Sequence, residues 1–125
     1  MNKDDLLNAI RTRMPEKRFV HTLGVMETAI RLAKVYEVDE KEAELSAIFH
    51  DVVKFADRDW MKQTIIDQQM DPTLLTFHHE LWHAPVGAYV AQQEFRVTNQ
   101  DVLNAICYHT TGRKYMSKLE KIIYC

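Results

Sequence analysis

Glycine and proline are scarce in this chain, with three of each among 125 residues. Tight turns rely on these two residue types, so their scarcity argues against a many-stranded sheet and favours long helices. Cysteine is also rare. Cys107 and Cys125 form no CxxC pair, and we expect both to be reduced thiols. The first residues lead into no apolar stretch of the signal-peptide kind, which predicts a cytoplasmic protein.

A strong charge of one sign and long apolar runs are missing as well. The net charge is −2, and Lys and Arg are scattered among Asp and Glu. This distribution argues against binding to nucleic acid or to an anionic membrane. No apolar run approaches the roughly 18 residues that a membrane-spanning helix needs.

What the chain does contain is typical of one globular domain. Apolar residues make up 46% and charged residues 27%, which fits a folded chain rather than a disordered one. The length fits a single domain over residues 1–125. Apolar residues recur at every third or fourth position, and alternating runs are absent. The sequence therefore predicts an all-α fold, a helical bundle.

Proline and capping residues place the first helices. A short helix over residues 4–10 is expected to end before Pro15, and Pro15 with Glu16 begins a long helix. The predicted inward face of that helix comprises His21, Gly24, Val25, Thr28, Ala29 and Leu32. Asp39 is predicted to cap the next helix. Its inward face comprises Ala43, Ala47, His50, Asp51 and Lys54.

The second half of the chain gives similar signals. Asp57 begins a helix, a turn or short helix starts at Asp71, and Pro85 opens a further helix. Thr98 or Asn99 caps the next one, and a capping box of Ser117 and Glu120 precedes the last. That last helix has barely two turns before Cys125, whereas helices average about 11–12 residues. We therefore expect the sequence to stop within an element.

The segment HELWH, residues 79–83, fits the H-E-x-x-H pattern of zinc proteases. That site needs both histidines in one continuous helix. Pro85 follows closely and disfavours the helical conformation of Ala84, so we expect HELWH to end one segment before a new helix begins. His78, His79 and Glu80 are then interpreted as a solvated turn, and a protease is not the expected function.

The dipeptide His50-Asp51 is the stronger chemical signal. An imidazole nitrogen beside a carboxylate suits iron, manganese or zinc, and the two carboxylate oxygens could bridge a pair of metals. The dipeptide alone is more typical of residues that cap or salt-bridge a helix end. Its context favours the metal, because His21, His83 and His109 also occupy inward or helix-terminal positions. Buried imidazoles need partners, and a metal would supply them.

Four segments in order resemble the HD-domain superfamily of metal-dependent phosphohydrolases. They are RFVHTLGV, IFHDVVK, WHAPVGA and CYHTTGR, around the four histidines. The chain is most similar to the bacterial YqeK branch, the symmetrical diadenosine tetraphosphate hydrolases, from about residue 3 to its end. The resemblance implies that residues 1–125 form the N-terminal portion of a longer HD domain.

The resemblance also implies a site. Three positions match ligands of an iron centre: His21, His50 and Asp51. His83 and His109 match positions that hold a second metal or contact substrate phosphates. By the same resemblance, His21 and Asp51 also lie in the substrate site.

Lys54 matches the lysine of the family's HDxxK pattern, and Thr110 with Thr111 matches a polar pair near the nucleotide. These threonines could equally form a helix C-terminal turn. The family's helix corresponding to residues 118–125 continues into an alanine-aspartate pair that completes the first metal shell. This sequence stops short of that pair and of a further region that closes over the nucleotide.

The implied activity is hydrolysis of dinucleoside polyphosphates to two nucleoside diphosphates, with one or two divalent metals, iron above all. Asp51 and Lys54 would be catalytic, and the partners would be a small-molecule nucleotide and, in a homodimer, a second copy. Arg18 and Arg113 could contact phosphate but are interpreted as surface charges. Alternatives are a nucleoside monophosphatase or phosphodiesterase of the same superfamily, or a non-catalytic nucleotide-binding module.

Overall fold

The computed structural model describes residues 1–124 and shows seven α-helices and two short 3-10 helices in that range, with no strand. The all-α prediction is confirmed. Cys125, whose thiol state was predicted, lies outside the described residues. The helices are α1 (Lys3–Arg11), α2 (Glu16–Tyr36), α3 (Glu40–Phe49), α4 (Arg58–Asp67), η1 (Pro72–Thr76), η2 (His79–Leu81), α5 (His83–Phe95), α6 (Gln100–Cys107) and α7 (Lys118–Ile123).

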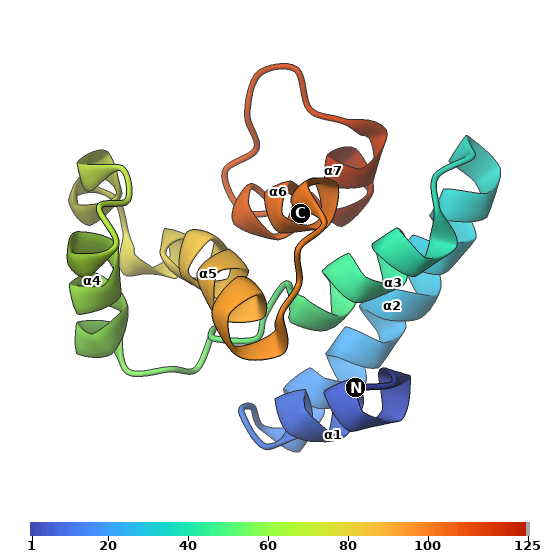
Figure 1. Cartoon of the computed structure of the whole chain (residues 1–125), viewed down its shortest axis with the longest axis horizontal. Helices are drawn as coiled ribbons and strands as arrows, with labels where there is room; N and C mark the ends of the chain where they lie inside the picture. Colours follow the sequence, from blue (N-terminus) through green and yellow to red (C-terminus); the bar gives the residue numbers. More distant parts are fainter. Residues whose placement is uncertain (125) are drawn as a thin grey trace.

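Helix α3 contacts α1, α2, α5, α6 and α7, and its C-terminal end reaches the middle of the molecule (Figure 1). Its main partner is α2, which runs alongside it, while α4 and α5 lie together on the opposite side of the view. Residues at the C-terminal end of α3 are therefore surrounded by other helices. That end carries His50 and Asp51.

Most of the predicted helix starts are confirmed. The side chains of Asp39, Asp57 and Asn99 accept hydrogen bonds from backbone N–H groups at the starts of α3, α4 and α6. Ser117 and Glu120 form the predicted capping box at α7. Such caps satisfy N–H groups that have no partner within the helix.

The predicted inward face of α2 is wrong by about one residue. His21, Gly24 and Thr28 are exposed, and the buried residues are Phe19, Thr22, Met26, Ala29 and Ala33. These positions follow the same three-and-four spacing, rotated by the 100° or so that separates neighbouring helical side chains. Small alanines on this face suit the close packing of α2 on α3. His21 therefore lies at the edge of the packed face.

Two boundaries also differ from the sequence prediction. Helix α3 ends at Phe49, and residues 50–55 form turns in which, for example, the Lys54 N–H donates to the Asp51 carbonyl at 3.1 Å. Helix α5 begins at His83 rather than at Pro85, so Ala84 is helical. Pro85 is accommodated because N–H groups of the first turn lack helical partners in any case.

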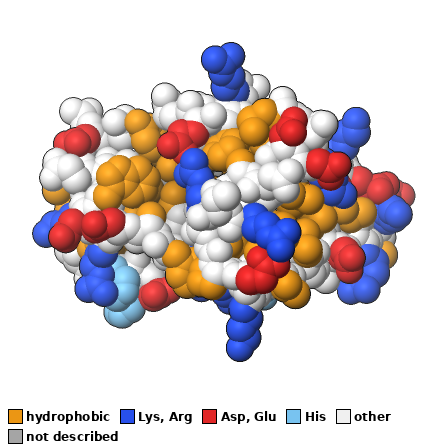
Figure 2. All heavy atoms as spheres, turned by 90° about the horizontal axis from the view of Figure 1, so that it is seen from below, with side chains coloured by type: hydrophobic (Ala, Val, Ile, Leu, Met, Phe, Trp, Pro, Cys, Tyr) orange, Lys and Arg blue, Asp and Glu red, His pale blue; other side chains and the backbone are white. Residues whose placement is uncertain are grey.

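The surface of the described residues mixes both charge signs. On the face shown in Figure 2, Lys and Arg side chains alternate with Asp and Glu and with apolar patches. In residues 1–124, no helix is both long enough and apolar enough to cross a membrane.

Candidate metal centre

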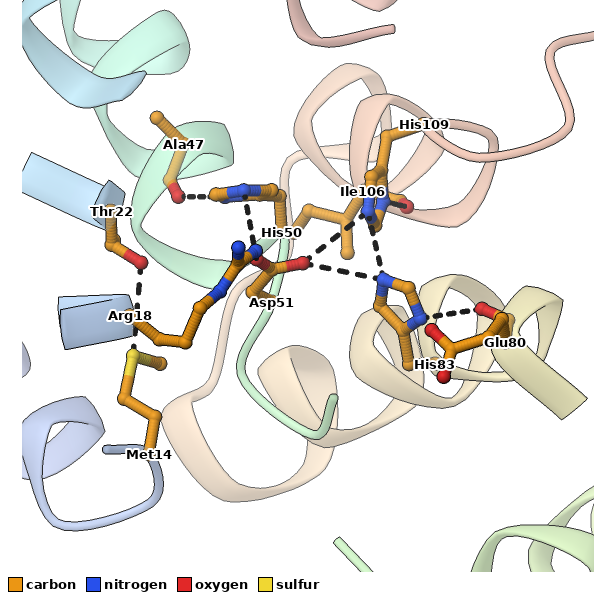
Figure 3. A network of polar contacts seen from close by, with 10 residues as sticks. All are labelled: Met14, Arg18, Thr22, Ala47, His50, Asp51, Glu80, His83, Ile106 and His109. Carbon is orange, nitrogen blue, oxygen red and sulfur yellow. Dashed lines mark hydrogen bonds and ion pairs between the residues drawn. The ribbon is translucent and has the colours of Figure 1, made fainter. Parts of the chain in front are cut away.

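The carboxylate of Asp51 is the hub of a buried polar cluster (Figure 3). Its side chain is 4% exposed. Oδ2 lies 3.4 Å from His50 Nε2, while Oδ1 lies 3.3 Å from His83 Nε2 and 3.8 Å from His109 Nε2. The three histidines come from the end of α3, the start of α5 and the turn after α6. The fold thus brings together four residues that were candidates in the sequence.

All three buried imidazoles are anchored in the same way. Nδ1 of His50, His83 and His109 lies 2.6, 2.7 and 2.8 Å from the carbonyl oxygen three residues earlier in the chain. A carbonyl oxygen only accepts, so each Nδ1 carries the hydrogen and each Nε2 of a neutral ring presents a lone pair. This tautomer is the one that binds a metal through Nε2, and the carbonyl fixes the ring orientation.

The lone pairs converge closely. His83 Nε2 and His109 Nε2 are only 3.2 Å apart, and both face Asp51. Two neutral rings with hydrogens on Nδ1 cannot donate to each other at that contact. A cation that both nitrogens and the carboxylate can bind would remove the repulsion. The donor set of imidazole nitrogens and one carboxylate therefore fits a divalent metal of the iron, manganese or zinc kind.

Two groups of three possible ligands share Asp51. His21, His50 and Asp51 form one group, and Asp51, His83 and His109 form the other, with the ligand atoms of each group within 4.8 Å of one another. Asp51 is the residue common to both groups of possible ligands. All five predicted metal ligands belong to these groups.

His21 differs from the other histidines because it is exposed at the edge of α2. Its ring centroid is 6.1 Å from that of His50. Partial desolvation and the nearby positive charge of Arg18 hold the pKa of His21 below its usual value. The ring is thus neutral and able to bind a metal over a wider pH range than a free histidine.

Arg18 is not the ordinary surface charge that the sequence suggested. Its side chain is 29% exposed, and Nη2 donates to Asp51 Oδ2 at 2.6 Å. Burial opposes ionisation of Asp51, but the rings of His109, His50 and His83, which can donate from Nε2 when they are protonated, outweigh burial and hold the pKa of Asp51 far below its usual range. Asp51 is therefore a carboxylate at any ordinary pH, as a metal ligand must be.

The remaining predicted site residues lie around this cluster. Lys54 is half-buried, and its positive charge contributes to the lowered pKa of His21, which places it on the His21 side. Thr110 directly follows His109, and its buried Oγ1 has no hydrogen-bond partner among the described residues. Thr111 is exposed and donates to the Gly112 carbonyl, as in the turn that was the alternative interpretation.

The turn after His109 is held by α7. Arg113 donates two hydrogen bonds to the buried carboxylate of Glu120, at 2.7 and 3.1 Å, and its guanidinium stacks on the Tyr108 ring. The Tyr124 ring lies over Gly112, whose φ of 66° favours glycine. This support was not predicted from the sequence, because the capping box indicates the position of Glu120 but not the burial of its carboxylate.

The HELWH segment does not form a zinc-protease site. His79 lies in η2 and His83 begins α5, so the two histidines do not share one continuous α-helix. His79 contacts Arg58 at 3.3 Å, and His78 Nδ1 accepts a hydrogen bond from the Glu80 N–H. Only His83 of this segment joins the Asp51 cluster.

Comparison with known proteins identifies the family to which the chain belongs. Residues 18–124 match the HD domain family, and the chain belongs to that family. A crystal structure from Clostridium acetobutylicum, described as that of a predicted HD superfamily hydrolase involved in NAD metabolism, superimposes with a TM-score of 0.93 at 34% identity, over 99% of this chain and 66% of that chain.

Curated relatives indicate which members of the HD domain family this chain is similar to. Proteins named symmetrical bis(5'-nucleosyl)-tetraphosphatase from Bacillus subtilis and Halalkalibacterium halodurans are 49% and 48% identical to this chain. The alignments cover 99% of the chain and 67% and 66% of the relatives. The chain therefore spans about two thirds of their length. The resemblance inferred from the four histidine segments is confirmed.

Proposed function

We propose that this chain carries the metal centre of a hydrolase that cleaves dinucleoside tetraphosphates symmetrically into two nucleoside diphosphates. The observation that carries the proposal is the convergence of the three Nε2 atoms on Asp51, which suits a divalent cation. The names of relatives at 49% and 48% identity support this substrate class.

The reaction adds water to one of the two central phosphorus atoms and breaks the bond from that atom to the oxygen that bridges the two. The departing nucleoside diphosphate takes up the proton that the water loses. A bound divalent cation would supply Lewis-acid chemistry and a more acidic water. Asp51, held ionised, can orient the water by accepting a hydrogen bond from it.

The open side of the cluster suits a polyphosphate. His21 is exposed there, and Lys54 adds a compact positive charge that can neutralise phosphate oxygens. The unpaired hydroxyl of Thr110 and the exposed Thr111 follow His109 and are our candidates for nucleotide contacts, together with His83 and His109. We assign Asp51 and Lys54 the catalytic roles.

Iron as the resident metal, a homodimer and a cytoplasmic location belong to the same proposal. The mixed imidazole and carboxylate donors are compatible with iron, and they suit manganese or zinc as well. Elemental analysis of protein purified without added metal would identify the ion. Sedimentation analysis would establish whether two copies associate.

The direct test is a product analysis. Diadenosine tetraphosphate should give ADP alone as nucleotide product, whereas ATP with AMP would show asymmetric cleavage and reject the proposal. Nucleoside monophosphates and phosphodiesters complete the substrate panel. Phosphate release only from monophosphates would instead assign a monophosphatase, and nucleotide binding without any turnover would assign a binding module. Asp51→Asn should be inactive on every substrate, and Asp4→Asn, the same replacement at an exposed position of α1, should match the unmodified chain.

A further inference from the structure

Arg18 connects α2 to the centre of the cluster. It lies one helical turn before His21, and its Nη2 bonds to an Asp51 oxygen that is 33 positions further along the chain. Figure 3 shows the guanidinium reaching across to the carboxylate. The 2.6 Å distance and the opposite charges make this a strong, charge-assisted hydrogen bond.

The rest of the Arg18 side chain shows which partner sets its orientation. Nε is buried and has no hydrogen-bond partner within residues 1–124. An unpaired buried donor is unfavourable, so this orientation persists only if another contact offsets it. The bond from Nη2 to Asp51 is the contact that does so. The observed orientation of Arg18 therefore satisfies the Asp51 carboxylate and leaves one donor of the guanidinium, Nε, without a partner.

The bond between Arg18 and Asp51 gives the two carboxylate oxygens different histidine neighbours. Arg18 holds Oδ2, the oxygen that faces His50, and the other oxygen then faces His83 and His109. Rotation of the carboxylate would exchange or misalign the two oxygens. Without the arginine, the described contacts to Asp51 come from imidazole Nε2 atoms, which carry no hydrogen when their rings are neutral.

We propose that Arg18 is a positioning residue that fixes the Asp51 carboxylate so that each oxygen serves a different cation, and so makes occupancy of two sites possible. The inference rests on the proposed metal centre but not on its substrate. Residues that hold a metal ligand from behind typically change metal affinity by about 10–100-fold when replaced. Arg18 would act in that way on Asp51.

The guanidinium has a competing effect of opposite sign. Its positive charge repels a cation nearby, and on that ground alone its removal would tighten metal binding. Positioning predicts weaker binding instead. The direction of the change in affinity therefore distinguishes the two roles.

The test compares three variants with the unmodified chain. Arg18→Met removes the charge and the bond, Arg18→Lys keeps the charge without the planar fork, and Arg31→Met makes the same replacement at an exposed position of α2. Mn²⁺ is titrated by isothermal calorimetry, and the electron paramagnetic resonance spectrum reports whether two ions lie close enough to couple. Circular dichroism confirms that each variant is helical.

Arg18→Met is expected to bind Mn²⁺ about 10–100-fold more weakly and to lose the coupled spectrum in favour of that of isolated ions. Arg18→Lys should fall between, and Arg31→Met should match the unmodified chain. Should Arg18→Met fail to fold, the comparison of Arg18→Lys with Arg31→Met decides. Unchanged or tighter binding in the folded Arg18 variants overturns the proposal, as does an unmodified chain that binds only one Mn²⁺. Coupled Mn²⁺ binding without diadenosine tetraphosphate hydrolysis would reject the proposed function alone.

Discussion

Two groups of histidines in this molecule have opposite surroundings. His50, His83 and His109 are at most 5% exposed at their side chains, and each anchors Nδ1 on a backbone carbonyl. His78 and His79 stack on each other in a surface turn, with ring centroids 4.2 Å apart. The first group converges on a carboxylate. The second contacts Arg58 and the Glu80 backbone.

The comparison indicates that backbone anchoring, rather than the number of histidines in a segment, distinguishes the candidate metal centre from the surface turn. Of this second pair, His79 belongs to the better-known sequence pattern, HELWH, and His78 directly precedes it, yet both lie outside the two groups of possible ligands. The buried rings come from three separate elements, and each is oriented by a carbonyl three residues earlier. A ring that is oriented in advance loses little freedom when it binds an ion.

The contrast between the buried and the surface histidines is tested most directly by replacing one histidine from each group. His50→Ala should lower Mn²⁺ affinity by at least about 100-fold, because it removes a ligand itself rather than an outer partner. His79→Ala should leave the affinity unchanged. Calorimetric titration and elemental analysis measure both. Retention of metal by His50→Ala would mean that the buried group has been assigned wrongly.

Metal binding should also stabilise the fold, since the ligands come together only when α3, α5 and α6 are packed. At free Mn²⁺ of 100 times the dissociation constant, the free energy of unfolding should rise by about 2.7 kcal/mol. Urea unfolding with and without the ion measures this. The increase should persist in His78→Ala and shrink in His83→Ala. An equal increase in both variants would place the ion elsewhere.

The support under His109 should respond to a smaller change at α7. Glu120→Gln weakens the bonds to Arg113 and to the Ser117 N–H, and we expect a loss of about 2 kcal/mol of stability near pH 7. Burial acts to raise the pKa of Glu120, but these bonds prevail and lower it from 4.5. The stabilisation is therefore present above pH 4.5 and is lost as the pH falls through the folded-state pKa. Urea unfolding at several pH values should show the two proteins converging in acid, and a constant difference would contradict this linkage.

Much of the architecture could be predicted from the sequence because it depends on local signals. The caps Asp39, Asp57 and Asn99 act on N–H groups two or three residues away, so their effect is visible in the sequence itself. The buried face of α2 was predicted wrongly because packing against neighbouring helices determines which face of a helix is buried. Gly24 and Thr28 looked inward by spacing but are exposed, whereas Met26 and Ala33, which were not predicted, are buried beside the predicted Ala29.

The candidate site shows the same division. Five histidine and aspartate positions were identifiable from their sequence context, and the structure brings them together. The pairing of Arg18 with Asp51 and the burial of Glu120 were not identifiable, because both depend on contacts made across helices. An arginine one turn before a candidate ligand is the one sequence signal that could have pointed to the first.

The reactivity of the Cys107 thiol tests whether the C-terminal end of α6 stays closed to solvent, and it is the smallest of the expected effects. It lies two residues before His109, and burial raises the pKa of its thiol to about 11. Only the thiolate reacts with iodoacetamide, so a thiol with this pKa should react about 100-fold more slowly at pH 8 than one with the ordinary value of 9. Mass spectrometry of the Cys107 peptide measures the rate, and raising the pH towards 11 should accelerate it. Fast alkylation at pH 8 would show that the end of α6 opens, and the contrast between the buried and the exposed histidines would then be weaker than the structure indicates.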